Sequence, residues 1–181
     1  MSERWVLNAS PLIVLARIDR TDLLFALADD LVVPSAVAAE IEAGPASDRA
    51  RQAIEAGKFV IADTPPPPAE VLAWDLGVGE TAVLSLALAE DGWTVILDDA
   101  MARKCARSFS RRLKGTLGVI LLAQQRGLIA SAAEVIRSLR ATGFHLDDQI
   151  IMIAPHRSAS LRACDRRATP FQTGVSQSIG G

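Results

Sequence analysis

Gly92-Trp93-Thr94-Val95-Ile96-Leu97-Asp98-Asp99 is a short apolar run that ends in two adjacent carboxylates, and it decides the fold. Its length, its bounding glycine and its Val, Ile and Trp content predict a strand that is covered on both faces. In open α/β sheets, ligands bind just beyond the carboxyl ends of such strands. The two acids therefore predict an active-site floor, where they face water or hold a cation.

The segment before this strand, residues 79–90, predicts a helix that is closed by Gly92. Glu80 lies in its first turn, where the helix dipole favours a negative charge. Gly77 and Gly79 resemble part of a phosphate loop, but the full spacing and a preceding strand are missing, so nucleotide binding is not favoured. A helix that begins with an acid and a strand that ends with acids can converge at one edge of a sheet.

The rest of the N-terminal half alternates between short apolar runs and helical segments. Ser10 and Pro11 predict the start of the first helix, which places Asn8 at the end of the first strand. Glu40 lies on a later helix, and four prolines, residues 65–68, form a surface spacer. The expected strands are residues 5–7, 31–33 and 58–61, and the expected helices are residues 12–18, 23–27, 36–43, 46–57 and 69–74.

The C-terminal half predicts helices and a tail. The expected helices are residues 100–109, 117–125, 131–140 and a last short one ending near residue 153, with a loop at residues 111–114. Thr116 can cap the second of these helices. A domain is expected over residues 1–155, followed by a disordered basic tail, residues 156–181, that lacks apolar periodicity. Strands that alternate with helices indicate an α/β sandwich with a mainly parallel sheet.

The composition indicates a single globular domain. The chain has 181 residues, of which 50% are hydrophobic, and its mean hydropathy is +0.25. No stretch reaches the roughly 18 apolar residues of a membrane span, and no signal-peptide apolar region follows Met1. We therefore expect a cytoplasmic protein without membrane contact. The two cysteines show neither zinc spacing nor a disulfide framework.

Charge is divided along the chain. Residues 1–100 hold 6 Lys and Arg against 17 Asp and Glu, whereas residues 101–181 hold 13 against 4. One interpretation is that surface charges happen to segregate. The other is an acidic metal pocket beside a basic groove that receives a phosphate backbone. The residues in question are Arg103, Lys104, Arg107 and Lys114, and both interpretations stay open for them.

Four polar residues lie at comparable places in the predicted elements. Asn8 and Asp98 end strands, Glu40 lies on a helix, and Glu80 begins a helix, with Asp99 next to Asp98. Clustered carboxylates repel one another, so such a site is held together by hard divalent cations, Mg²⁺ or Mn²⁺. A cation of this kind supports phosphodiester hydrolysis without a protein nucleophile. A histidine mechanism is not favoured, because the only two histidines come late in the chain. Each acid alone also has a structural explanation, as a capping or solvated residue.

Five segments in order resemble the PIN domain family, and within it the small prokaryotic, VapC-like toxins. They are residues 6–16, residues 32–37 with Glu40, and residues 76–82, 97–103 and 114–119. The resemblance covers about residues 4–154. It implies a Rossmann-like, three-layer α/β/α fold and a Mg²⁺- or Mn²⁺-dependent ribonuclease that cleaves single-stranded RNA. Such a protein is commonly the toxin of a toxin–antitoxin pair, so the expected partners are RNA, a cognate antitoxin protein and a second copy in a homodimer.

The resemblance also implies roles for individual residues. Glu40, Glu80 and Asp98 would be the catalytic acids, and the metal ligands would be Asn8, Glu40, Glu80 and Asp98, with Asp99 as a helper. Contacts to RNA would come from Ser10, Arg103, Lys104, Arg107, Lys114 and Thr116. The family most often has Asp where this chain has Asn8, and an amide keeps an oxygen ligand but removes one charge.

Two other classes of function stay open. The first is a PIN module that is catalytically impaired by Asn8 and that binds nucleic acid or an antitoxin partner. The second is a phosphoacceptor receiver or a phosphatase built on aspartates at strand ends. The second is less favoured because a receiver needs paired acids after its first strand, where this chain has Asn8-Ala9-Ser10.

Overall fold

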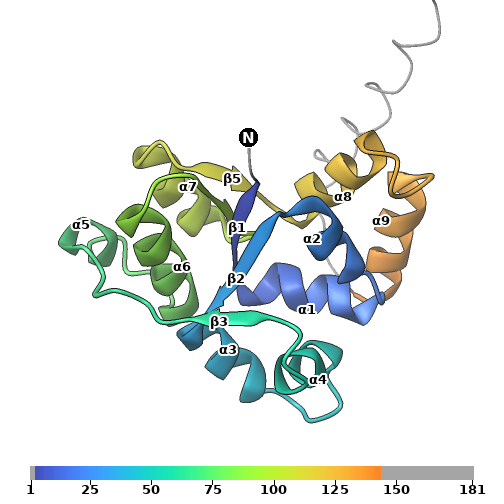
Figure 1. Ribbon diagram of the computed structural model, residues 1–181, viewed down its shortest axis with the longest axis horizontal. Helices are drawn as coiled ribbons and strands as arrows, with labels where there is room; N and C mark the ends of the chain where they lie inside the picture. The colour runs from blue at the N-terminus through green and yellow to red at the C-terminus, as the bar shows by residue number, and fades with distance from the viewer. Residues whose placement is uncertain (1–2, 144–181) are drawn as a thin grey trace, which may run out of the picture. The chain divides into compact units, whose positions relative to one another are not determined.

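Short apolar runs of the sequence become the strands of one parallel sheet. The computed structural model describes residues 3–143 (Figure 1), and the predicted last helix and the basic tail lie outside these residues. The strands are β1 (Arg4–Leu7), β2 (Asp30–Pro34), β3 (Val60–Ala62), β4 (Trp93–Ile96) and β5 (Arg112–Lys114). They lie in the order β3-β2-β1-β4-β5, and each neighbouring pair is parallel.

Helices cover both faces of this sheet, so the three-layer α/β/α prediction is confirmed. Figure 1 shows α5, α6 and α7 on one side of the sheet and α1, α2, α8 and α9 on the other. Helix α3 contacts both α1 and α6. The helices are α1 (Ala9–Arg17), α2 (Asp22–Leu27), α3 (Ser35–Glu42), α4 (Arg49–Glu55), α5 (Ala69–Leu72), α6 (Val78–Ala89), α7 (Ala100–Ser108), α8 (Thr116–Gln125) and α9 (Ala132–Ala141).

The hydrophobic core fixes the two central strands. Helix α6 contacts β1, β2 and β4, and most of its side chains from Ala82 to Ala87 are buried. Removing so much apolar surface from water is the main term that stabilises a fold of this kind. The fully buried apolar side chains of β1 and β4 are Trp5, Val6, Leu7, Val95 and Ile96. No helix within residues 3–143 combines the length and the apolar character needed to cross a membrane.

The strand order makes the carboxyl ends of β1 and β4 the place where open α/β sheets bind ligands. The chain leaves β1 toward β2 on one side and later returns to β4 on the other, which makes this the switch point of the sheet. Leu7 pairs with Ile96 across the two strands, and the backbone N–H of Asn8 donates to the Ile96 carbonyl at 3.2 Å. The residues that follow both strands therefore emerge at one edge.

Three local predictions are wrong. Residues 112–114, predicted as loop, form β5 because they pair with residues 94–96 of β4. An edge strand needs only one paired side, so its charged side chains are tolerated. Helix α1 begins at Ala9, and Asn8 rather than Ser10 takes the cap position, without a capping bond from its side chain. Helix α8 likewise begins at Thr116 itself, with Gly115 at the cap position.

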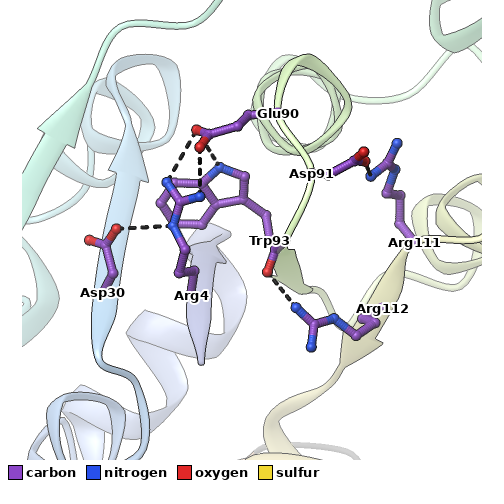
Figure 2. A network of polar contacts seen from close by, with 8 residues as sticks. Arg4, Asp30, Glu90, Asp91, Trp93, Arg111 and Arg112 are labelled. Carbon is purple, nitrogen blue, oxygen red and sulfur yellow. Dashed lines mark hydrogen bonds and ion pairs between the residues drawn. The ribbon is translucent and has the colours of Figure 1, made fainter. Parts of the chain in front are cut away.

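At the amino edge of the sheet, Arg4 joins three elements (Figure 2). Its guanidinium donates to Asp30 at 3.3 Å and to Glu90 at 2.7 Å, and it lies 4.0 Å from the centre of the Trp93 ring. Arg111 pairs with Asp91, and Arg112 donates to the Gly92 carbonyl nearby. This end of the sheet is thus tied together by charge, and part of the basic half is paired with acids.

Candidate active site

Asn8 follows β1 and is a buried polar residue at the carboxyl edge, with 2% of its surface exposed. Its Nδ2 donates to Glu80 Oε1 at 3.1 Å. Because an ionised carboxylate only accepts hydrogen bonds, the amide must present its NH₂ group to Glu80 and its oxygen away from it. Among the described residues that oxygen, Oδ1, has no hydrogen-bond partner. A buried carbonyl oxygen without a partner is exceptional in folded proteins and points to a ligand site.

Glu40, from α3, meets Asn8 above Gly79 of α6. A Cβ atom at Gly79 would lie 2.6 Å from Glu40 Oε2 and 3.1 Å from Asn8 Oδ1. A Cβ atom at Gly77 would collide with Glu80 Oε2. The two glycines therefore leave room for acidic side chains, which explains them without a phosphate loop. Asn8, Glu40 and Glu80 are called the acidic cluster from here on.

The electrostatics of the acidic cluster favour a cation. Burial of the Glu40 carboxylate raises its pKa, and the negative charge of Glu80 raises it further. Both effects make a negative charge on Glu40 unfavourable as long as no cation compensates it. Two carboxylates and one amide carbonyl form an all-oxygen donor set, which is the kind that Mg²⁺ and Mn²⁺ prefer. The residues present therefore fit a hard divalent cation.

Asp98 follows β4 and is held by other partners. Its Oδ1 accepts from the Thr116 backbone N–H at 2.8 Å, and its Oδ2 accepts from the Thr116 hydroxyl at 2.6 Å and from Ser10 Oγ at 3.5 Å. Among the described residues, the hydrogen bonds of Asp98 are thus made to Thr116 and Ser10, and none joins it to the acidic cluster. Across residues 3–143, no three His, Cys, Asp or Glu side chains are grouped so that they could hold a metal ion. The acidic cluster reaches three donors only through the amide of Asn8.

Comparison of the sequence with known protein families identifies the family of the chain. A family model described as a PIN domain matches residues 4–157. The chain belongs to the PIN domain family. No curated protein matches the sequence. PIN domains are in general nucleases that use divalent metal ions, so membership gives this protein a nuclease-type, hydrolytic function.

In this PIN domain, Asp99 has a local structural role. Its carboxylate accepts from the backbone N–H of Ala102 at 2.8 Å and so caps α7. An acidic N-cap satisfies a free donor of the first helical turn and suits the positive end of the helix dipole. The hydrogen bond of Asp99 is made to α7 and not to the acidic cluster.

The predicted RNA contacts fall into two groups. Arg103 donates to the Leu97 carbonyl at 2.9 Å, and Lys114 lies 3.6 Å from Glu3 and 5.7 Å from the centre of the Trp5 ring. Burial lowers the pKa of Arg103, the charge of Arg107 lowers it further, and Asp98 acts in the opposite direction. Both Arg103 and Lys114 therefore have partners within the PIN domain. Lys104 and Arg107 are exposed on α7 and are open to a ligand.

Sequence reasoning missed the glycines. In the sequence, Gly77 and Gly79 resemble part of a phosphate loop, and all three of Gly77, Gly79 and Gly115 lie in PIN-like segments without a role of their own. A Cβ atom at Gly115 would lie 2.7 Å from Arg103 Nη1 and 2.8 Å from Asp98 Oδ1. The signal in the sequence is the spacing Gly77-Val78-Gly79-Glu80, in which two glycines precede an acid.

Proposed function

We propose that this PIN domain is a metal-dependent endoribonuclease that hydrolyses phosphodiester bonds of single-stranded RNA. The observation that carries the proposal is the buried Oδ1 of Asn8, which has no partner among the described residues and lies beside Glu40 at the carboxyl edge of the sheet. Asn8, Glu40 and Glu80 would hold Mg²⁺ or Mn²⁺. Once bound, the cation supplies an activated water and positive charge for the phosphoryl oxygen.

The residues of the chain contribute position and charge. Asn8 fixes the carboxylate of Glu80 through its Nδ2 hydrogen bond. Gly79 keeps the space between Glu40 and Asn8 open, so that a phosphate group can approach. Lys104 and Arg107 on α7 attract the RNA backbone, because each phosphate that they neutralise releases counterions.

Cleavage of a fluorescent single-stranded RNA tests this proposal. The full chain with Mn²⁺ should cleave the RNA, and EDTA should abolish cleavage. Glu40→Gln should also abolish it, because a neutral amide cannot replace a charged ligand. Glu42→Gln is the matched control, since it makes the same change two residues further on the same helix, about 200° around its axis, and it should cleave like the unmodified chain. Cleavage that survives EDTA or the Glu40→Gln change contradicts the proposal.

We place this activity in a toxin of the VapC type, held by a cognate antitoxin in the cytoplasm and acting as a homodimer. The support is the order of the five motifs in the sequence. Expression of the chain in a bacterium should then arrest growth, and Glu40→Gln should relieve the arrest. Growth that is equal with both forms contradicts the toxin assignment but leaves the nuclease proposal standing.

Asn8 favours a second candidate, a PIN module that binds RNA or an antitoxin without cutting. The amide gives the cluster one negative charge less than an aspartate would, which weakens attraction to a dication. RNA binding by the unmodified chain, with no cleavage at any Mn²⁺ concentration, would favour this candidate. Cleavage by Asn8→Asp alone would then identify the amide as the cause.

A further inference from the structure

Two large apolar side chains are exposed where α6 and α7 begin, and we call them the apolar pair. They are Val78, the first residue of α6, and Met101, in the first turn of α7, with 78% and 46% of their surfaces exposed. Single exposed apolar residues are ordinary, but exposed apolar residues that gather at one place mark interaction sites. The position of the apolar pair in the fold therefore decides what it can bind.

Val78 lies between two glycines that touch the acidic cluster. A Cβ atom at Gly77 would collide with Glu80 Oε2, and one at Gly79 would lie 2.6 Å from Glu40 Oε2. The backbone on both sides of Val78 is thus next to the acidic cluster, whereas its own side chain is left in solvent. Val78 therefore stands beside the proposed cation site without being part of it.

Met101 lies at the end of α7 that is nearest to the carboxyl edge, because α7 starts directly after β4. Helices α6 and α7 are on the same side of the sheet and contact each other (Figure 1). The exposed face of α7 includes Met101, Lys104 and Arg107. Residues three apart are neighbours on a helix surface, about 4.5 Å apart along the axis. One apolar and two cationic side chains thus follow one another along α7, away from the carboxyl edge.

The charges around the apolar pair indicate a ligand that is both anionic and aromatic. Lys104 and Arg107 suit phosphate groups. An apolar partner would remove water from these two cations without pairing them, which is unfavourable. Methionine is flexible and polarisable, and its thioether makes favourable contacts with aromatic rings. Single-stranded nucleic acid offers phosphates together with unstacked bases, whose ring faces bind side chains of this kind.

From this arrangement we infer that Val78 and Met101 form a subsite for one unstacked base of single-stranded RNA, beside the phosphate that is cleaved. The inference rests on the proposed function for the identity of the ligand. Lys104 and Arg107 hold the backbone on one side of this base, and the acidic cluster lies on the other. Because every base has a ring face, the subsite favours unpaired RNA without selecting one base.

Fluorescence anisotropy of the full chain, with Ca²⁺ in place of Mn²⁺, tests the inference. The probes are a single-stranded oligouridine and an oligomer of the same length without bases. Met101→Ala should weaken oligouridine binding by at least about fourfold, the value of one methylene group removed from contact, and should leave binding of the base-free oligomer unchanged. The slope of log K against log salt should stay the same, because no phosphate contact is lost. Val78→Ala should behave in the same way.

Two control variants accompany these changes. Leu128→Ala removes an apolar side chain of similar exposure, 43%, that follows the far end of α8. Helix α8 has 10 residues and begins beside Asp98, so Leu128 is about 15 Å from the carboxyl edge. This variant should bind both oligomers as the unmodified chain does. Met101→Leu keeps the apolar volume and should retain oligouridine binding.

The other outcomes separate this inference from the proposed function. Unchanged oligouridine binding in both Met101→Ala and Val78→Ala overturns the base subsite, leaves the nuclease proposal standing and favours a protein partner for the apolar pair. Equal losses with both oligomers also overturn the subsite, because the lost contact is then not made to a base. An unmodified chain that binds neither oligomer overturns the RNA proposal and this inference together.

Discussion

Asn8 stands where the family resemblance implies an aspartate, and the structure shows which contacts its amide makes. It donates to Glu80 through Nδ2 and leaves Oδ1 buried next to Glu40. An aspartate could accept a cation but could not make that donation, because an ionised carboxylate has no N–H or O–H. The amide therefore stabilises the metal-free protein, and we expect it to lower the affinity for the proposed metal ion.

Asn8→Asp should reverse this balance. It should tighten Mn²⁺ binding, and it should lower the free energy of unfolding of the metal-free protein. The expected loss is on the order of 2 kcal/mol, from one lost hydrogen bond and one added like charge. Calorimetry and urea denaturation of both forms measure the two effects. Equal Mn²⁺ affinities would mean that residue 8 does not contact the ion.

Glu40 gives the metal-free protein a pH dependence. Its pKa is raised by burial and by Glu80, so the folded protein keeps the proton of Glu40 to a higher pH than the unfolded chain does. Its contribution to stability is fully present below the unfolded pKa of about 4.3, and it is lost as the pH rises through the raised value. Glu40→Gln should become progressively more stable than the unmodified chain across that interval.

Urea denaturation at a series of pH values, without metal, measures this difference. Saturating Mn²⁺ supplies the control, because a metal competes with the proton. With Mn²⁺ the unmodified chain should gain stability as the pH rises. A difference between the two forms that stays constant with pH would show that Glu40 is not in the environment described.

The first turn of α6 contains a glycine, Gly79, at the point where the side chains of Glu40 and Asn8 need space. Glycine within a helix costs about 1 kcal/mol relative to alanine, so Gly79 is unfavourable for the helix alone. Its lack of a Cβ is what allows Glu40 and Asn8 to meet above it. Gly79 therefore lowers the stability of the helix but leaves the space that the acidic cluster needs.

Gly79→Ala tests this explanation. The new Cβ would lie 2.6 Å from Glu40 Oε2, so the carboxylate must move, and Mn²⁺ affinity should fall by at least about tenfold. Gly118→Ala on α8 is the control, because its Cβ would have Lys114 Cβ at an ordinary 3.6 Å. It should stabilise the protein by up to about 1 kcal/mol and leave Mn²⁺ affinity unchanged. Unchanged Mn²⁺ affinity in Gly79→Ala would contradict the account.

Elements with a strong apolar period were predictable from the sequence, and those that depend on distant partners were not. The strand at residues 93–96 and the helix after Gly77 followed from local pattern. Strand β5 was not predicted because the charged residues Arg112 and Lys114 are typical of a loop. They form a strand only through their pairing with β4. The partners of Asp98 lie 88 and 18 residues away along the chain, a distance at which local pattern carries no information.

Across the described residues, the fold brings basic side chains of the C-terminal half next to acidic side chains of the N-terminal half. Arg111 pairs with Asp91, Lys114 lies by Glu3, and Arg103 is bonded to a backbone carbonyl. These contacts join the basic half to the acidic half within one sheet. Arg103 and Lys114 thus have partners within residues 3–143, and the RNA contact that we propose is made by the exposed Lys104 and Arg107.

The salt dependence of RNA binding measures that difference. Lys104→Ala with Arg107→Ala should weaken binding and reduce the slope of log K against log salt by about 1.4, for two lost phosphate contacts on a single strand. Lys114→Ala is the control and should leave the slope unchanged, because its ammonium group is placed beside Glu3. Fluorescence anisotropy with Ca²⁺ in place of Mn²⁺ gives the binding constants. Equal slopes for the double variant and the unmodified chain would mean that Lys104 and Arg107 form a solvated face and do not contact RNA.

The most direct test of the account is the position of the cation itself. Crystals of the full chain soaked in Mn²⁺ and measured at a wavelength where manganese scatters anomalously would locate the ion. The account predicts an anomalous peak in contact with Asn8 Oδ1 and the carboxylates of Glu40 and Glu80. No peak at the carboxyl ends of β1 and β4, or a peak there that contacts none of these three residues, would contradict it.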